Sequence, residues 1–311
     1  MHCWFHRNVL FSALIRGADI TGWKQALTKT WLYRGTLHGV AYDDLPRLLS
    51  LHKGESWLRR VYGEQMIADI AKEVIRCMED GVYSRAEMRK IFSEYYEPKV
   101  IEYIFSSWGG IFVYLASLGK VAFRDMTSRD FDMIDAEPVY TSEEVLPDIM
   151  RRYFKAHGPE TLDDAAWFLG VWRDYKKTLQ NLSLDEYESF ELDGKTYYHC
   201  GEPTETGDIP EYNLLSGFDP IIMSYTDRSA VLPAEYKNKV SLKSGICLPT
   251  IAVNGKVAGV WNIKKGEPVV EFFDKQPDRI VNGVLELVDS ISWRAEPDKR
   301  KFPKASFRCG Y

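Results

Sequence analysis

The chain has 311 residues, 45% of them hydrophobic and 14% aromatic, which suits a folded protein of two or three units. A formal net charge of −5 argues mildly against a strong non-specific nucleic-acid binder, and no apolar run reaches the length of a membrane span. The five cysteines are scattered and never spaced as C-x-x-C, and no signal-peptide pattern opens the chain. We therefore expect a cytoplasmic protein without a disulfide framework or a structural zinc site.

The amino-terminal part, residues 1–83, is predicted to be mainly helical. Apolar residues recur at helical spacing from Phe11 to Ile15 and again from Leu45 to Leu58. Residues 31–40 look extended, and Asp43 or Asp44 is expected to cap the next helix. With 11 Lys/Arg against 9 Asp/Glu this part carries +2, and the remaining segments are acidic or neutral. Contact with nucleic acid would therefore have to come from local cationic patches.

Residues 84–137 are predicted to form a winged helix-turn-helix, which is three helices followed by a two-stranded ribbon. Ser84 begins a capping box at the first helix, and Pro98 opens the second. The third helix contains no Lys or Arg, so we interpret it as core and not as a DNA-reading helix. This helix and the two strands are expected at residues 111–118, 121–123 and 131–134.

Residues 142–200 are predicted to repeat that order as a second winged helix. Ser142 is expected to cap a helix that runs to about Ala156 and is ended by His157-Gly158-Pro159, and Thr161 is expected to cap the next one. A third helix and a hairpin with an Asp-Gly turn, the wing, are predicted at residues 171–182 and 190–198.

The carboxy-terminal part, residues 201–311, is predicted to be a β-rich unit with a final helix and a basic tail. Asn254-Gly255 lies between two apolar runs and favours a hairpin turn with positive φ at both centres. The preceding run places Asp219, Asp227 and Arg228 among apolar residues, where an unpaired charge is costly. A further strand and the last helix are expected at residues 269–273 and 276–293.

The run 217–229, paired with the run 245–261, closely resembles the carboxy-terminal part of bacterial winged-helix proteins related to the interstrand-crosslink DNA glycosylases AlkZ and YcaQ. Segments 30–38 and 157–161 are also typical of this AlkZ/YcaQ-like family, and the resemblance extends from about residue 2 to about residue 275. It implies an α+β fold with tandem winged-helix units, the first of them within residues 1–83. It also implies duplex DNA, intact or damaged, as the partner.

In active members of that family a short motif, Gln-x-Gln or Gln-x-Asp, precedes the Arg-Gly-Thr-Leu-His strand and positions the water that attacks the sugar. The resemblance places His2 and Trp4 at the catalytic positions of this motif. A histidine can hold or activate water as a general base, whereas an indole has only an N–H and accepts no proton. Relatives carry a further helical segment before the motif, so either the reading frame begins upstream or the site has degenerated. These residues either hold the catalytic water or serve only as apolar packing, and we favour apolar packing.

Five basic or imidazole side chains are candidates for contact with DNA. Arg34 and His38 are four residues apart, which on a strand places them on one face; they either line the DNA-facing surface or Arg34 pairs with a nearby carboxylate. Arg173, Lys176 and Lys177 share one face of a predicted helix and suit phosphate contact, although such a trio also suits a solvated surface.

The signature residues Asp219, Tyr225, Asp227 and Arg228 mark the family. We interpret Asp227 and Arg228 as pairing with neighbours that hold the carboxy-terminal β unit against the helices, with a direct DNA role as the alternative.

The sequence thus favours a DNA-binding protein that lacks the standard catalytic Gln pair. An active glycosylase that releases alkylated bases in DNA repair is one alternative, and a non-catalytic regulator or protein-interaction scaffold is another. No cofactor motif is present and no metal is expected, because Asp43-Asp44 and Asp163-Asp164 lie at helix starts, where the helix dipole favours negative charge.

Overall fold

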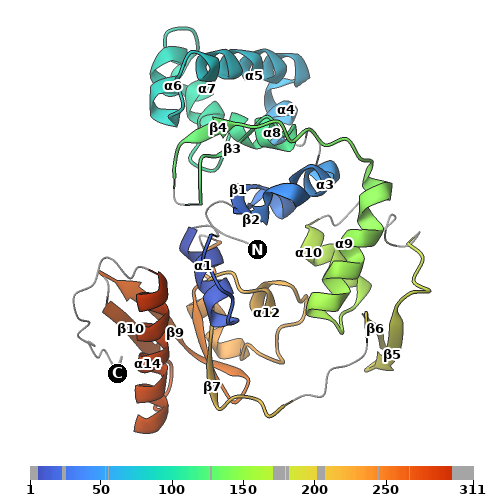
Figure 1. Ribbon diagram of the computed structural model, residues 1–311, viewed down its shortest axis with the longest axis vertical. Helices are drawn as coiled ribbons and strands as arrows, with labels where there is room; N and C mark the ends of the chain where they lie inside the picture. Colours follow the sequence, from blue (N-terminus) through green and yellow to red (C-terminus); the bar gives the residue numbers. More distant parts are fainter. Residues whose placement is uncertain are drawn as a thin grey trace. The chain divides into compact units, whose positions relative to one another are not determined.

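The computed structural model describes residues 6–22, 26–52, 54, 56–126, 128–170, 179, 182–201, 207–243, 245–265 and 267–295. The chain divides into two compact units. Gly22–Ile149 forms one, here called the middle unit, and Met1–Thr21 with Met150–Tyr311 forms the other, called the terminal unit. Figure 1 shows the helices and strands of both units, coloured along the sequence.

An antiparallel sheet in the order β2-β1-β3-β4 organises the middle unit. Lys29 of β1 lies opposite Gly39 of β2 and opposite Phe123 of β3. A hairpin that follows the third helix of the predicted 84–137 unit therefore pairs with a strand from the amino-terminal part of the chain. The strands are β1 (Leu27–Trp31), β2 (Leu37–Ala41), β3 (Val121–Phe123) and β4 (Phe131–Met133).

Helices bury their apolar faces to form the core of the middle unit. In the long helix α5, residues Ile67, Ile70, Val74 and Met78 recur every three or four positions and have no exposed surface. Short helical segments precede it and three more helices follow it in the chain (Figure 1). Their bounds are η1 (Tyr33–Gly35), η2 (Tyr42–Asp44), α3 (Leu45–Leu49), η3 (Ser50–His52), α4 (Trp57–Tyr62), α5 (Glu64–Glu79), α6 (Arg85–Phe92), α7 (Pro98–Ile104) and α8 (Ile111–Ser117).

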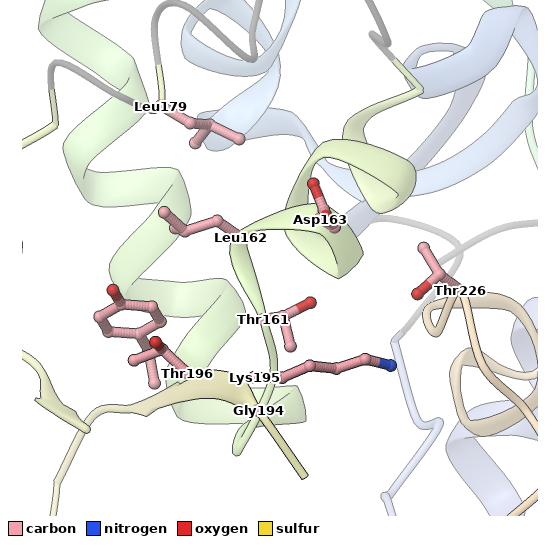
Figure 2. Close-up of a pocket in the computed structure, with 9 residues that line it drawn as sticks. Thr161, Leu162, Asp163, Leu179, Gly194, Lys195, Thr196 and Thr226 are labelled. Atoms are coloured by element: carbon pink, nitrogen blue, oxygen red, sulfur yellow. The ribbon is translucent and has the colours of Figure 1, made fainter. Parts of the chain in front are cut away.

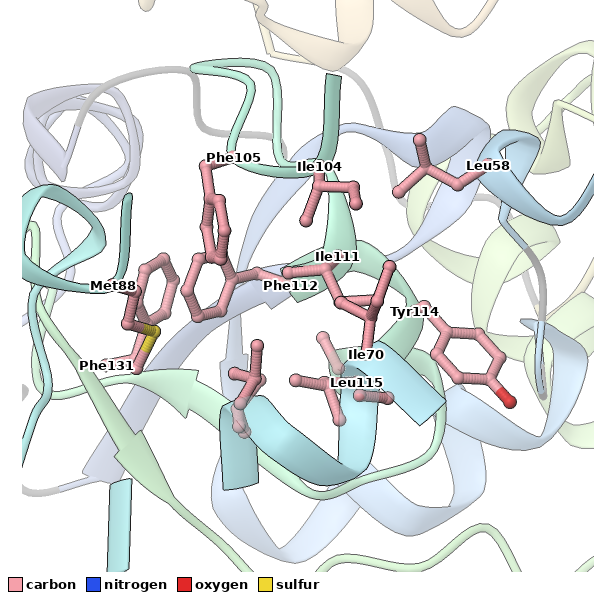
Figure 3. Close-up of a cluster of buried hydrophobic side chains, with 14 of the residues drawn as sticks. Leu58, Ile70, Met88, Ile104, Phe105, Ile111, Phe112, Tyr114, Leu115 and Phe131 are labelled. Carbon is pink, nitrogen blue, oxygen red and sulfur yellow. The ribbon is translucent and has the colours of Figure 1, made fainter. Parts of the chain in front are cut away.

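Helix α8 lies inside this core, as its lack of charge predicts. Figure 3 shows Phe112 of α8 beside Phe105, and the Phe112 ring stacks on Phe131 of β4 with 3.9 Å between centroids. Gly110, just before α8, has φ +57, and a Cβ there would lie 1.9 Å from the carbonyl oxygen of Ile104. The prediction that α8 belongs to the core is therefore confirmed.

A second antiparallel sheet, in the order β10-β9-β8-β7, forms the centre of the terminal unit. Helix α1 brings Phe11 to within 5.3 Å, between ring centroids, of the buried Trp261 of β9, whose indole N–H donates to the carbonyl oxygen of Leu215. Helix α14 packs along β10 and β9 (Figure 1), and its Val284 and Val288 are fully buried. Helix α9 (Ser142–His157) enters this unit at Met150. The other elements are α1 (His6–Ile15), α10 (Leu162–Leu169), β5 (Glu188–Leu192), β6 (Lys195–His199), β7 (Tyr212–Leu215), α12 (Pro220–Met223), η4 (Ala234–Tyr236), α13 (Lys237–Val240), β8 (Thr250–Val253), β9 (Lys256–Lys264), β10 (Glu267–Phe272) and α14 (Asp278–Ala295).

Both predicted hairpin turns are confirmed by their backbone angles. Asp193 and Gly194 between β5 and β6 have φ of 51° and 72°, and Asn254 and Gly255 between β8 and β9 have φ of 48° and 77°. Asn, Asp and Gly tolerate this left-handed region better than other residues, which is why the turns could be predicted from sequence.

The helix caps agree with the predictions in part. Ser84 accepts a hydrogen bond from the backbone N–H of Glu87, and Thr161 accepts one from Asp164. The prediction for Ser142 is wrong by one residue, because Thr141 accepts from the N–H of Glu144 at 3.3 Å. Asp44 stands at the N-cap of α3, but its side chain makes no capping hydrogen bond.

The predicted α+β class is confirmed by these helices and antiparallel sheets. The arrangement as tandem winged helices and the division at 1–83, 84–137, 142–200 and 201–311 stay predictions. The helix expected at 171–182 falls mostly on residues outside the described part of the chain. Across the described residues, no helix is both long enough and apolar enough to span a bilayer.

Candidate functional site

The carboxylate of Asp219 is the most constrained polar group in the signature run. Its residue has no exposed surface. Oδ2 accepts from the N–H and the hydroxyl of Ser216 at 3.1 and 3.0 Å, and Oδ1 accepts from the N–H of Ile221 at 3.1 Å and from Nη2 of Arg16 at 2.8 Å. Each oxygen thus uses both of its lone-pair positions. Asp219 fixes the turn before α12 and ties it to the end of α1, and it has no free lone pair with which to activate water.

Asp164 of α10 forms a second joint to the same run. Its Oδ2 completes the capping box with the N–H and hydroxyl of Thr161, at 3.1 and 2.7 Å. Its Oδ1 accepts from the N–H and hydroxyl of Thr226, both at 2.7 Å. One buried carboxylate therefore binds the start of α10 to the signature run by charge-assisted hydrogen bonds.

Tyr225 and Arg228 extend this joint. The Tyr225 hydroxyl donates to the carbonyl oxygen of His157 at 3.0 Å, and the Trp167 indole donates to that of Met223 at 2.8 Å. The Arg228 guanidinium lies 5.7 Å from the centre of the Trp167 ring. These contacts agree with the interpretation that the run holds the carboxy-terminal β unit against the helices.

Asp227 differs from the expectation that it lies among apolar residues. It is exposed, and its Oδ1 accepts from the backbone N–H of Ser229, two residues on, at 3.0 Å. This hydrogen bond lowers the pKa of the carboxyl. Asp227 stabilises a local turn and contributes nothing to the joint between α10 and the run.

His157, at the end of α9, is a partly exposed imidazole beside the Arg16–Asp219 ion pair. Burial, and then the charge of Arg16, lower its pKa to about 4, although the charge of Asp219 opposes the change. Its ring packs against Tyr153 and Phe168, with centroids 5.3 and 5.4 Å away. At neutral pH it is therefore uncharged, with one ring nitrogen able to accept a hydrogen bond from water or substrate.

Glu160 is the most perturbed acid of this region. It has no exposed surface, and its carboxyl oxygens make no hydrogen bond of ordinary geometry within the described residues, although the Tyr225 hydroxyl lies close enough to lower its pKa. Burial, and then the nearby charge of Asp164, raise its pKa to about 9. The side chain is a neutral carboxylic acid at pH 7, and full burial keeps it from touching a substrate.

A cavity of about 390 Å³ opens beside the Asp164 joint, between the start of α10 and the hairpin β5–β6. Thr161 and Thr226 contribute hydroxyls whose protons already point to Asp164, so they offer only lone pairs to a ligand. In Figure 2 the Lys195 side chain extends toward the side on which Thr226 lies. One cation with hydroxyl acceptors can hold a small polar group, but these side chains supply no activated nucleophile.

The predicted candidates are not brought together by the described structure. His2 and Trp4, and the trio Arg173, Lys176 and Lys177, lie outside the described residues. Their roles stay predictions.

The prediction that Arg34 and His38 share one strand face is wrong. Arg34 lies in the turn between β1 and β2 with φ 58° and ψ 20°, a left-handed conformation followed by Gly35. His38 is in β2 and buried, with Nδ1 2.9 Å from the carbonyl oxygen of Thr36 and its ring edge-on to Tyr33. The prediction of an extended strand failed because Arg34 adopts a positive φ, which its residue type does not predict.

Comparison with known proteins decides the family. The family model described as "DNA glycosylase AlkZ-like" matches residues 24–273 of this chain. The chain belongs to the AlkZ-like DNA glycosylase family. The resemblance inferred from the signature runs is thus confirmed.

One curated relative and one solved structure bear on this family assignment. An interstrand DNA cross-link repair glycosylase of Streptomyces sahachiroi is 26% identical over 274 residues, which cover 80% of this chain and 73% of that protein. The solved structure of Streptomyces sahachiroi DNA glycosylase AlkZ is similar in fold, with a TM-score of 0.66 and 23% identity, over 90% of this chain and 82% of that one.

Within this AlkZ-like chain, sequence reasoning missed the cluster formed by Arg16, His157, Glu160 and Asp164. The sequence predicts only a capping role for Asp164. Its hydrogen bond to Thr226 could not be predicted, because the two residues are 62 positions apart. The only sequence signal for this region is that segment 157–161, which contains His157 and Glu160, resembles the family. Among the described residues, no group of three or more His, Cys, Asp or Glu side chains lies in a position to hold a metal ion.

Proposed function

We propose that this AlkZ-like protein binds duplex DNA in the cytoplasm and releases alkylated bases feebly or not at all. The family match over residues 24–273 carries the first part, because it spans the signature run together with the helices that the run joins. The relative's title, an interstrand DNA cross-link repair glycosylase, supports alkylated or crosslinked duplex DNA as the class of ligand.

The second part rests on the residues available for chemistry. Hydrolysis of an N-glycosidic bond needs a polar group that places water at the anomeric carbon. The resemblance places His2 and Trp4 at the positions where active members of the family have Gln and Gln or Asp, and Trp accepts no proton. In the terminal unit the carboxylates of Asp219 and Asp164 are saturated with hydrogen bonds, and Glu160 is fully buried.

We expect the purified protein to bind duplex DNA weakly, with an affinity that falls steeply as salt rises. The whole chain is acidic, so binding must come from a few local phosphate contacts, each contributing about −0.9 to the slope of log K against log salt. Gel-shift titrations at several salt concentrations measure this slope. Absence of binding even at low salt would favour the protein-interaction scaffold instead.

An active glycosylase is the second candidate, and the uncharged, partly exposed His157 beside Arg16 favours it. We expect little or no formation of abasic sites when the protein is incubated with DNA that carries N7-alkylguanine. Efficient base release would contradict the proposal, and single variants would then locate the chemistry. Loss of release in His2→Ala would establish a histidine variant of the family motif, whereas loss in His157→Ala alone would place the water-orienting group at the end of α9.

A further inference from the structure

Arg85, the first residue of α6, carries a guanidinium that is partly buried against aromatic rings. Its Cζ lies 5.4 Å from the centroid of Phe112 and 5.5 Å from that of Phe131, the two stacked rings of the middle-unit core. Burial, and then the charge of Arg89, lower its pKa to about 10. In the described part of the chain no carboxylate forms an ion pair with it.

Arg89 lies one turn further along α6, on the same face as Arg85. It is exposed, and its charge repels that of Arg85. Glu87, the acid between them in sequence, accepts from the Ser84 hydroxyl at 2.5 Å, and its own backbone N–H donates to the Ser84 hydroxyl oxygen at 3.1 Å. The two arginines therefore form a cationic pair without a counterion among the described residues.

The neighbouring hairpin β3–β4 shows the opposite arrangement. Arg124 of this hairpin lies over the Tyr83 ring at 5.3 Å, and its charge is neutralised by Asp132 at 3.0 Å and Asp130 at 3.8 Å. For Arg124, which also packs on an aromatic ring, the protein itself therefore supplies the carboxylates that balance the charge. At Arg85 the aromatic support is present and the anion is not.

We propose that Arg85 and Arg89 form a phosphodiester-binding site that holds the backbone of one DNA strand against the middle unit. This inference rests on the proposed DNA binding. Helix α8 is buried in the core, so the middle unit needs another element to contact DNA. Side chains at i and i+4 start about 6 Å apart, and phosphates of one strand follow every ~3.4 Å along the axis, so both guanidiniums reach one short stretch of backbone.

The stacked Phe112 and Phe131 rings give this site its geometry. Because Cζ is about equally far from the two stacked centroids, the guanidinium packs beside the edges of both rings, and this support holds the planar group in place for bidentate contact with phosphate oxygens, which a flexible ammonium cannot match. Phosphates carry no base identity, so the site contributes affinity without sequence preference.

Salt-dependent DNA binding by the full chain tests the site. Arg89→Gln removes an exposed charge without touching the core, and it is expected to reduce the magnitude of the log K against log salt slope by about 0.9. The double variant R85Q/R89Q is expected to reduce it by about 1.8, equally on two duplexes of unrelated sequence. Lys90→Gln, an equal charge change at the next position of the same helix, is the matched control and should leave the slope unchanged.

The outcomes separate this site from the broader proposal. If the wild type binds DNA and Arg89→Gln keeps the wild-type slope, the phosphodiester site is wrong, and an acidic protein surface becomes the partner of this pair. Equal reductions of the salt slope in K90Q and R89Q would also overturn the proposed site, since any cation on α6 would then contribute equally to DNA binding. Failure of the wild type to bind duplex DNA at low salt would overturn both the proposed function and this site.

Discussion

Replacing Asp219 by alanine is expected to lower the free energy of unfolding of the terminal unit by about 3–5 kcal/mol, because several donors around this buried carboxylate would lose their acceptor, each at about 1–3 kcal/mol. The substitution would leave the hydroxyl and N–H of Ser216 and the N–H of Ile221 without acceptors, and the Arg16 charge without its partner. The nine tryptophans are spread over both units, so the protection of the fully buried Val284 and Val288 of α14 against amide hydrogen exchange is the measurement that reports the loss in the terminal unit.

Two variants make this measurement specific. Asp227→Ala removes another aspartate of the same run, and because Asp227 is exposed we expect a change within about 0.5 kcal/mol. Arg16→Met removes a side chain that is 42% exposed, so we expect it to lower the free energy of unfolding by about 1 kcal/mol, as for exposed ion pairs. An Asp219→Ala effect as small as that of Asp227→Ala would contradict the assignment of Asp219 as the anchor of the run.

Glu160→Gln is expected to remove a strong pH dependence from the stability of the terminal unit. In the folded protein the pKa of Glu160 is raised to about 9, whereas in the unfolded chain it returns to 4.5. Between these values the folded state keeps a proton that the unfolded state has lost, so stability falls as pH rises, by about 1.4 kcal/mol per pH unit. By pH 7 the accumulated cost is about 3 kcal/mol relative to pH 4.5.

The stabilities of the wild type and Glu160→Gln are best compared between pH 7 and pH 9, where His157 does not titrate. His157 has its pKa lowered to about 4 from 6.5, so it makes stability rise with pH only between those two values and is neutral above them. Unfolding of the wild type and of Glu160→Gln, followed at pH 7, 8 and 9, should give a falling series for the wild type and a flatter one for the variant. Glu235→Gln changes an exposed glutamate of the same unit and should retain the wild-type slope. Parallel slopes for the wild type and Glu160→Gln would show that Glu160 is ionised in the folded protein.

Local chemistry explains which parts of the fold could be predicted. Asp193-Gly194 and Asn254-Gly255 form hairpin turns because those residues accept positive φ, and the caps at Ser84 and Thr161 need only a residue three positions away. Arg34 adopts the same backbone region without any such signal, and so the turn between β1 and β2 was interpreted as strand.

Tertiary pairing explains most of what could not be predicted about the site. The sequence identified Asp219 as a charge that needs a partner, but its partner Arg16 is 203 residues away. The raised pKa of Glu160 depends on complete burial beside Asp164, and no residue type or spacing indicates that. Family resemblance located the runs, whereas the physical roles of their side chains required coordinates.

The pairing of β1 with β3 has a consequence for how the middle unit is made. A fragment that began at residue 84 would keep α6, α7, α8 and the β3–β4 hairpin, yet it would lack the strand that hydrogen-bonds to the other side of β3. That edge would then present unpaired backbone groups beside the apolar residues Val121, Ala122 and Phe123, which is a template for self-association. During synthesis β1 leaves the ribosome about ninety residues before its partner, so for that interval the amino-terminal hairpin must itself avoid pairing with other chains.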